Sequence, residues 1–258
     1  MSQTHELITT GGLLTKRYVS WSRDEHRREW AVLNRVHAHT TDLAPRPVAA
    51  DLDADPPTVT MTLLPGRPLA GSLSPAQLDG LAVALRTLWS VPCEDLAPRR
   101  DEPGEFVARV AAGLAAAPRP AGLAGEACDA ARDWLRGVAF GPGRTTVLGG
   151  ADPNLANYLW DGERVRIVDF EDAGRSDPEI EVADLVEHLR ARDTDWSAFV
   201  AGFDLDPARL LAGRRVFAAF WLCLLLPGGR GEARNPPGTL DRQAARLLGL
   251  LAGDAGNR

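Results

Sequence analysis

The chain of 258 residues is long enough to bury a large core and to form one bilobed unit or two small domains. Hydrophobic residues make up 45% and charged residues 25%, as in ordinary globular proteins, and the net charge of −6 argues against a nucleic acid as the principal partner. The most apolar run, residues 216–226, is too short to cross a membrane, and we expect no signal peptide. Three cysteines without metal-ligand spacing indicate reduced thiols in a cytoplasmic protein.

The first predicted element is a hairpin over residues 5–19, which turns at Gly11-Gly12 and carries Lys16 on its second strand. Lys16 is the only lysine in the chain, and all the other residues counted as Lys or Arg are arginines. A lysine kept in such a composition indicates a site that needs a compact ammonium group rather than a planar guanidinium. The alternative is that one lysine has survived by chance in an arginine-rich chain.

A helix is predicted next, over residues 22–38, with an apolar stripe along one side. Glu29 lies within this helix and could form an ion pair that fixes the ammonium group of Lys16. Glu25, one turn earlier, is the competing candidate. For either glutamate, the alternative is a charge on the solvated face of the helix.

Residues 58–64 alternate as a strand does and end at Pro65-Gly66. The stretch 61–69 would be a hinge between two lobes, where backbone groups of Leu63 and Leu64 could hold a purine base; the alternative is a plain strand end followed by a turn. Helices dominate from there on, predicted at residues 75–89, 104–117 and 123–139, from 177 onward, and at 196–203, 207–226 and 239–252.

The most informative stretch spans residues 151–172. Asp152 and Asn157 stand five residues apart, and a hairpin predicted over residues 158–168 delivers Asp169 at its end. Oxygen ligands of this kind gather Mg²⁺ against phosphate groups, while a carboxylate left free of metal can orient a hydroxyl nucleophile. The alternative for the first pair is a surface turn with a capping Asp. The alternative for the second half is a plain hairpin, which explains the strands but not the acids at their ends.

Together these features resemble the aminoglycoside phosphotransferase and choline kinase superfamily, small-molecule kinases with a protein-kinase-like fold. The resemblance runs from about Lys16 to Asp184. Its most specific motifs are the catalytic loop Gly150-Ala151-Asp152 with Asn157, the metal motif Ile167-Val168-Asp169-Phe170-Glu171, and Asp177-Pro178 followed by Glu181 or Asp184 as a structural acid.

The resemblance implies an α+β, bilobed, protein-kinase-like fold, with a small β-rich N-lobe over residues 1–64 and a larger helical C-lobe over residues 65–258. Only fifteen residues precede Lys16, so a turn at Gly11-Gly12 implies that the family's first strand and phosphate-covering loop are absent. The N-lobe would then be shortened. A partner chain or the substrate could supply the missing cover, and a homodimer is therefore an expectation.

By the same resemblance, Asp152 is the catalytic base, and Asn157 and Asp169 are the ligands of Mg²⁺. Lys16 and Glu29 would position the phosphates of ATP or GTP. The cofactors expected are therefore magnesium and a purine nucleotide.

One departure lies in the catalytic loop, where the family has a histidine and this chain has Gly150. That histidine ties the loop to the metal-binding segment, so its absence predicts the loss of a hydrogen-bonding brace. The pair Gly149-Gly150 also predicts a more flexible loop.

The expected reaction is transfer of the nucleotide γ-phosphate to a hydroxyl of a small molecule, with an antibiotic or its precursor placed first by family resemblance. The alternatives are a metabolite kinase for choline, an amino alcohol or a sugar, and a non-catalytic nucleotide-binding pseudokinase. Acids after the metal motif could attract a cationic acceptor or could simply cap helices; they are Asp172, Asp177, Glu179 and Glu187. The candidates for an acceptor site are Glu171, Asp172, Trp221, Arg230 and Arg234.

Overall fold

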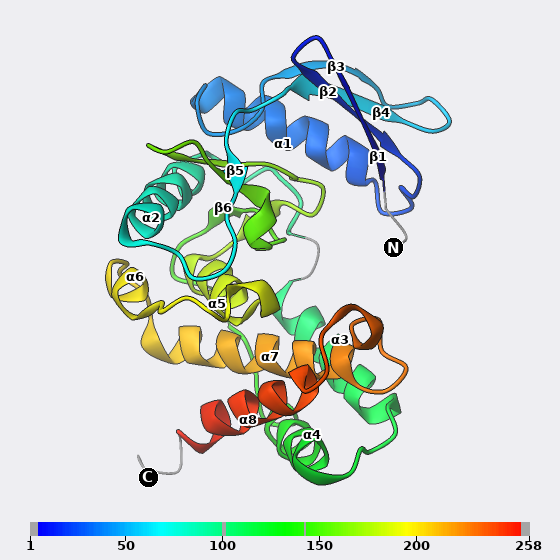
Figure 1. The fold of residues 1–258 in the computed structure, drawn as a ribbon, viewed down its shortest axis with the longest axis vertical. Helices are drawn as coiled ribbons and strands as arrows, with labels where there is room; N and C mark the ends of the chain where they lie inside the picture. The colour runs from blue at the N-terminus through cyan, green and yellow to red at the C-terminus, as the bar shows by residue number, and fades with distance from the viewer. Residues whose placement is uncertain (1–4, 100–101, 142, 254–258) are drawn as a thin grey trace.

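The computed structural model describes residues 5–99, 102–141 and 143–253. Figure 1 shows a small lobe, formed by a sheet and one helix, above a larger lobe that is mostly helical. The chain passes between them at β5 (Arg67–Pro68). This arrangement agrees with the predicted bilobed fold, and the predicted boundary after residue 64 falls just beyond the last strand of the small lobe.

The sheet of the small lobe is antiparallel throughout. Gly11 and Gly12, with φ of 57° and 78°, form the turn of its first hairpin, in the left-handed region that glycine adopts without strain. The predicted hairpin is therefore confirmed, and Lys16 stands opposite Leu7 on one side and Val59 on the other. The strands lie in the order β1 (His5–Thr10), β2 (Leu13–Tyr18), β4 (Thr58–Thr62) and β3 (Pro47–Asp51).

The helix of this lobe, α1 (Glu25–His39), packs its apolar side on the sheet through Val32, Leu33 and Val36, which are all buried. It begins three residues later than predicted. Asp24 stands just before the helix with a left-handed backbone, φ 58°, so the chain turns there and the helix begins after it. Its side chain makes no capping hydrogen bond.

Two short sheets flank the segment with Asp152, Asn157 and Asp169 beneath the small lobe. In one, β5 pairs with β7 (Tyr158–Trp160), which pairs with β8 (Val165–Ile167), so the predicted hairpin is confirmed. In the other, β6 (Val147–Gly149) pairs with β9 (Gly174–Ser176). The loop between β6 and β7 contains the 3₁₀ turn η1 (Leu155–Asn157).

Seven helices build the rest of the described large lobe, close to the predicted positions, and four of them begin with proline in the first turn. Small residues let the central helices approach closely: a Cβ on Gly213 would lie 2.8 Å from that of Ala183. Among the described helices, none is long and apolar enough to span a bilayer. In chain order they are α2 (Pro75–Trp89), α3 (Pro103–Ala116), α4 (Gly122–Leu135), α5 (Pro178–Glu187), α6 (Ser197–Ala201), α7 (Pro207–Leu225) and α8 (Thr239–Ala252).

Candidate active site

A cavity of about 320 Å³ lies between the sheet of the small lobe and the β7–β8 hairpin. Apolar side chains form its two faces, Leu14 and Met61 from the sheet and Leu159 and Val168 from the hairpin. A flat aromatic base fits between faces of this kind, and polar groups are gathered at one end. Six predicted site residues line this single cavity: Lys16, Glu29, Leu63, Leu64, Asn157 and Asp169.

The hinge at the edge of the cavity offers a donor from one of its two predicted residues. The N–H of Leu63 donates to the carbonyl of Gly12 at 2.9 Å, so it is already used inside the lobe. Pro65 has no N–H to offer. Among the described groups the N–H of Leu64 has no protein acceptor, and it is therefore the hinge donor open to a base.

Lys16 is 3% exposed, and its Nζ atom is surrounded by carboxylates. The Nζ atom lies 2.7 Å from Asp169 Oδ1, 2.8 Å from Glu29 Oε2 and 2.9 Å from Glu171 Oε2. Burial by itself would lower the pKa of Lys16, but these three acids outweigh it and raise the pKa. The ammonium group is thus charged in the folded protein, and the predicted pairing with Glu29 is formed.

Glu29 is fixed from two further directions. Its Oε1 atom accepts the N–H of Phe170 at 3.2 Å, which ties α1 to the metal motif, and its Oε2 atom accepts the hydroxyl of Tyr18. Glu25, the competing candidate, instead accepts the N–H of Arg23 at 2.9 Å. The contact with Lys16 therefore belongs to Glu29.

The acids around Lys16 have the chemistry of a magnesium site. Glu29, Asp169 and Glu171 each offer an oxygen atom, and these atoms lie within 4.8 Å of one another. Hard carboxylate oxygens are the ligands that Mg²⁺ prefers, and three acids around one ammonium group leave a surplus of negative charge. Burial raises the pKa of Asp169, and so do Glu29 and Glu171, although Lys16 opposes them.

Asp169 has φ 69°, which is rare for a residue with a side chain. The surrounding contacts must hold this backbone in place, because a left-handed conformation costs a non-glycine residue about 1–3 kcal/mol. Such strain collects where a side chain has to point in one direction. Here it aims the carboxylate at Lys16.

The structure places Glu171 beside Lys16, which is expected to position phosphates. It was expected as an acceptor-site candidate, but its carboxylate contacts Lys16 and lies 3.6 Å from Nδ1 of His5. Burial opposes ionisation of Glu171, and the contacts with His5 and Lys16 outweigh it and lower the pKa. Although Asp169 has a left-handed backbone, the carboxylates of Asp169 and Glu171 both reach the Nζ atom of Lys16.

The catalytic loop holds Asp152 through local hydrogen bonds. Asp152 Oδ1 accepts the N–H of Asn154 at 3.3 Å, and Oδ2 accepts from Asn157 Nδ2 at 3.1 Å. Because the amide nitrogen of Asn157 is engaged with Asp152, its oxygen remains for a cation. Burial raises the pKa of Asp152, although these two hydrogen bonds oppose it.

Helix α5 supplies a brace to this loop. The N–H of Gly150 donates to Oε2 of Glu181 at 3.0 Å, so Glu181 rather than Asp184 touches the loop. The sequence predicted that replacing the histidine by Gly150 would leave the loop without a brace. The structure corrects this in part, because the contact comes from the next helix instead of from the loop itself.

The model of a phosphotransferase enzyme family matches residues 6–220. The chain belongs to this family. It is therefore a phosphotransferase, as the sequence predicted. No curated protein matches the sequence.

Solved structures of this family's fold resemble the chain over nearly its whole length. A choline/ethanolamine kinase family protein from Mesorhizobium loti is 20% identical, covers 97% of this chain and 86% of its own, and has a TM-score of 0.65. The choline kinase LicA from Streptococcus pneumoniae is 13% identical, with coverage of 98% and 91% and a TM-score of 0.65. A streptomycin–ATP–APH(2")-IIa ternary complex is 14% identical, covers 95% of this chain and 91% of its own, and has a TM-score of 0.59. At these identities the likeness shows the fold and leaves the substrate open.

The acids that were weighed as attractors of a cationic acceptor are each engaged within the protein. Asp172 accepts from Arg23 at 2.7 Å, and Asp177 caps α5 by accepting the N–H of Ile180 at 3.0 Å. Glu179 accepts the N–H of Asp206 at 2.9 Å. These three acids therefore cap a helix or pair within the protein, which is the alternative to attracting a cationic acceptor.

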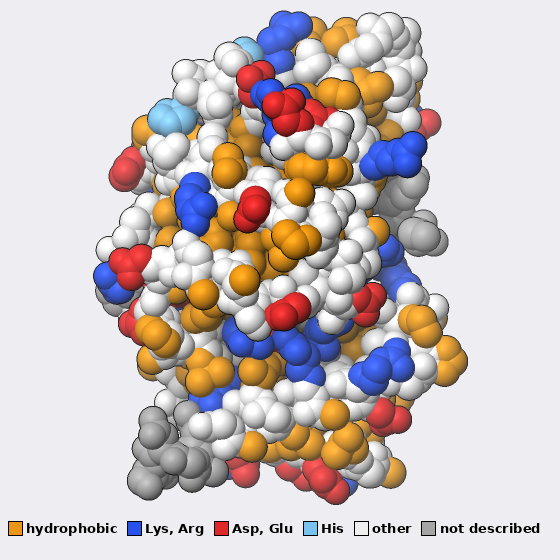
Figure 2. All heavy atoms as spheres, turned by 60° about the vertical axis from the view of Figure 1, so that its left-hand side comes forward, with side chains coloured by type: hydrophobic (Ala, Val, Ile, Leu, Met, Phe, Trp, Pro, Cys, Tyr) orange, Lys and Arg blue, Asp and Glu red, His pale blue; other side chains and the backbone are white. Residues whose placement is uncertain are grey.

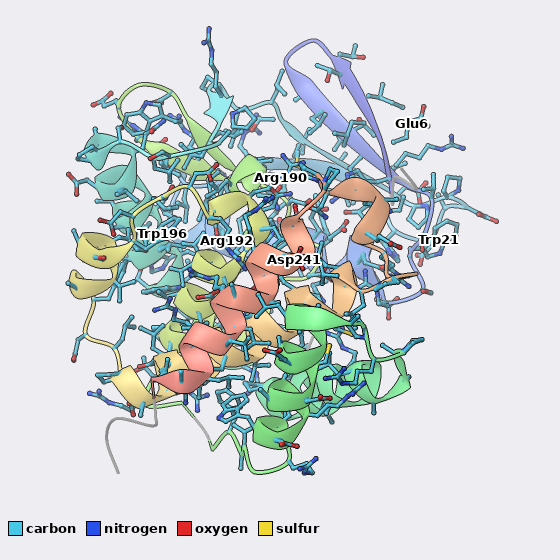
Figure 3. All side chains as sticks on the ribbon, turned by 60° about the horizontal axis from the view of Figure 1, so that its bottom comes forward. Glu6, Trp21, Arg190, Arg192, Trp196 and Asp241 are labelled. Carbon is cyan, nitrogen blue, oxygen red and sulfur yellow. The ribbon has the colours of Figure 1, made fainter. Side chains whose placement is uncertain are left out.

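Glu187, the fourth of these acids, is fully buried among arginines. It accepts from Arg214 Nε at 2.8 Å and from Arg246 Nη2 at 2.8 Å, and Arg192 donates to its carbonyl at 2.9 Å. Figure 3 shows Arg192 beside Arg190 in the helical lobe. In Figure 2, basic side chains form a band across this lobe, and they are arginines because the single lysine is buried.

The remaining acceptor candidates lie on the last third of the chain. Trp221 of α7 packs edge-on against His188 at the end of α5, with ring centroids 4.8 Å apart. Arg230 and Arg234 are exposed on the segment after α7, at and beside η3 (Glu232–Arg234). Among the described hydrogen bonds and ion pairs, none joins any of the three to Asp152, and their role at an acceptor site stays a prediction.

Sequence reasoning missed two residues that support the site. Tyr18 lies two positions after Lys16, so strand alternation alone could have placed both on the face toward α1. No local sequence pattern indicated Arg99, because it lies outside the helices and strands. Its partners are more than 80 residues away in the sequence.

Replacing Gly149 by alanine is expected to destabilise the fold by about 1–3 kcal/mol and to displace the catalytic loop. An added Cβ would lie 2.3 Å from Oε1 of Glu181 and 2.7 Å from Cβ of Ser176. The neighbouring change, Gly150→Ala, is the control, because its Cβ would meet nothing within 4 Å. Chemical denaturation of both variants measures the difference, and equal stability would contradict the tight contact.

Proposed function

We propose that this phosphotransferase uses Mg²⁺ to move the γ-phosphoryl group of ATP or GTP to a hydroxyl of a small molecule. One observation carries the proposal: Asn157 donates to the carboxylate of Asp152 and also lines the cavity that contains Lys16 and Asp169. The groups that would orient the acceptor and hold the metal therefore meet at one end of an apolar cleft.

The nucleotide base is proposed to lie between the two apolar faces of the cavity, with the N–H of Leu64 donating to its edge. Lys16 would then contact the phosphates, with Glu29 holding it in place. Asn157 and Asp169 would hold Mg²⁺, and the geometry adds Glu171 as a further carboxylate close enough to take part. The metal, when bound, neutralises charge on the phosphates.

Asp152 is proposed to orient the acceptor hydroxyl and to take its proton. Positioning and electrostatic stabilisation supply most of the rate in phosphoryl transfer, so a fixed carboxylate matters more than a strongly basic one. Its raised pKa brings it nearer to the working pH, as suits a group that gains and loses a proton.

The pairing of the acidic residues bears on the acceptor. Asp172 and Glu187 are ion-paired with arginines, and Asp177 and Glu179 bind backbone N–H groups. These acids therefore favour an acceptor that carries little positive charge over a polycation. Within the antibiotic class we place neutral hydroxyl-bearing compounds, such as nucleoside types, ahead of aminoglycosides, and a metabolite kinase remains the alternative.

The test is transfer of labelled γ-phosphate from ATP and from GTP to a panel of aminoglycosides, nucleoside antibiotics, sugars and amino alcohols, with Mg²⁺ or with a chelator. We expect a labelled product that requires Mg²⁺, and the acceptor that yields it names the class. If the protein binds nucleotide but neither transfers the phosphate nor slowly hydrolyses the nucleotide, the result would favour the pseudokinase alternative. Absence of nucleotide binding would overturn the assignment of the cleft. The cytoplasmic location and the homodimer stay predictions.

A further inference from the structure

Arg99 is a buried arginine outside the nucleotide cleft, 8% exposed, that joins two acids of α5. Its Nη1 atom donates to Glu181 Oε1 at 2.6 Å and its Nη2 atom donates to Asp184 Oδ2 at 2.6 Å. The two acids lie three residues apart, on adjacent turns of one helix face. A planar guanidinium can hold both at once, which a single ammonium group cannot do with the same geometry.

The backbone of Arg99 is itself fixed against the small sheet below the catalytic loop. Its N–H donates to the carbonyl of Arg175 at 2.9 Å, and the N–H of Arg175 donates to the carbonyl of Ala97 at 3.0 Å. This approach is possible because residue 174 is glycine: a Cβ there would lie 2.6 Å from the Arg99 nitrogen. From the small lobe, Arg28 adds a bond to the carbonyl of Pro98 at 2.7 Å.

The contact continues from Arg99 to the catalytic base. Glu181 uses one carboxylate oxygen for Arg99 and the other for the N–H of Gly150, two residues before Asp152. The residue between them, Ala151, has φ 60°, a conformation that a side chain disfavours and that neighbouring contacts must maintain. We infer that Arg99 is a positioning residue that, through Glu181, holds the catalytic loop in the conformation that aims Asp152.

Arg99 is needed because Glu181 cannot keep this orientation by itself. Glu181 and Asp184 are two carboxylates in a poorly solvated place, and without a cation between them one would take up a proton or turn toward water. Burial raises the pKa of Asp184 to about 7 even though Arg99 opposes it. The guanidinium therefore holds one oxygen of Glu181 in place and leaves the other for the loop. The inference rests on the proposed function, since it takes Asp152 as the catalytic base.

The test is Arg99→Lys, which keeps the positive charge but removes the fork that spans both acids. We expect the amide proton of Gly150 to exchange about tenfold faster, as for the loss of one stabilising hydrogen bond. In steady-state kinetics we expect kcat to fall by about tenfold to a hundredfold, while KM for the nucleotide stays within about twofold, because Arg99 does not line the nucleotide cavity. Unchanged exchange at Gly150, or unchanged kcat, would overturn the inference.

Arg209→Lys is the matched control. Arg209 also binds an acid of the α5 region through two nitrogens, Nε and Nη2, to Asp177 at 3.1 Å and 2.6 Å, but the pair does not touch the catalytic loop. It is expected to lower thermal stability without changing Gly150 exchange or kcat. A similar effect of both variants would assign Arg99 a purely structural role.

A second variant, Glu181→Gln, keeps the shape at the loop but removes the charge that Arg99 binds. It should speed Gly150 exchange as Arg99→Lys does, so failure of one variant to fold leaves the other to decide. Exchange at Gly150 is measured on the protein alone. If the wild type transfers no phosphate, the proposed function fails. Faster Gly150 exchange in the variants would still support the Arg99 contact, and unchanged exchange would contradict it.

Discussion

Asp152→Asn is expected to lower the rate of phosphoryl transfer by about a hundredfold to ten-thousandfold, the range that a general base contributes. The amide has the same shape and can still accept from Asn154 and face Asn157, so the fold and the nucleotide cleft should persist. It cannot take the proton of the acceptor hydroxyl. Turnover with a saturating acceptor, together with nucleotide affinity measured by calorimetry, separates the two effects.

The control for this change is Asp79→Asn, on the exposed face of α2, which should leave transfer unchanged. The pH profile gives a second check. The base must be ionised, and burial raises the pKa of Asp152, so kcat should fall as the pH drops through a value above that of an ordinary aspartate. Continued turnover in Asp152→Asn would remove Asp152 from the mechanism.

Lys16→Met is expected to destabilise the protein by about 3–5 kcal/mol, as when one partner of a buried ion pair is removed. Glu29, Asp169 and Glu171 would then face one another without a cation, with their oxygens within 4.8 Å. Protonation relieves such repulsion, so the loss of stability relative to the wild type should become smaller as the pH falls. Mg²⁺ should also restore more stability to the variant than to the wild type, because no ammonium group competes with it. Chemical denaturation with and without Mg²⁺ measures both effects.

Arg17→Met is the control for the lysine, because Arg17 is the next residue on the same strand and pairs with Glu6 at 3.3 Å on the surface. Its side chain is 46% exposed, and exposed pairs of this kind contribute about 0–1 kcal/mol. An equally small loss for Lys16→Met, or an absence of any Mg²⁺ effect, would contradict the charge cluster described for the cleft.

The contact between Lys16 and Asp169 joins two groups that are proposed to bind different parts of a Mg–nucleotide complex. The ammonium group that is proposed to hold phosphates is bound to Asp169, the proposed metal ligand, at 2.7 Å. A Mg–nucleotide complex would offer a cation to Asp169 and phosphates to Lys16, so each partner of the ion pair would gain a new partner. The pair could then separate without leaving either charge buried and unpaired.

The sequence by itself determined the local elements and the residue types of the site. The hairpin of residues 5–19 was predictable because alternation and a Gly-Gly turn are local properties. The sequence could nominate Asp152, Asn157 and Asp169 as site residues because short segments deliver them, with acids placed at strand ends, and their roles stay predictions. A lone lysine among arginines pointed to Lys16 for reasons of side-chain chemistry alone.

Only the tertiary structure decided which partners these residues take. Lys16 and Asp169 are 153 positions apart, and Phe170 and Glu29 are 141 apart, so no local pattern could pair them. The choice of Glu29 over Glu25 depended on how α1 lies against the sheet. The brace from Glu181 to Gly150 depended on the packing of α5 beneath the catalytic loop. Hydrogen bonds and ion pairs act over a few ångströms, and distances of that size between distant segments are fixed only once the whole chain has packed.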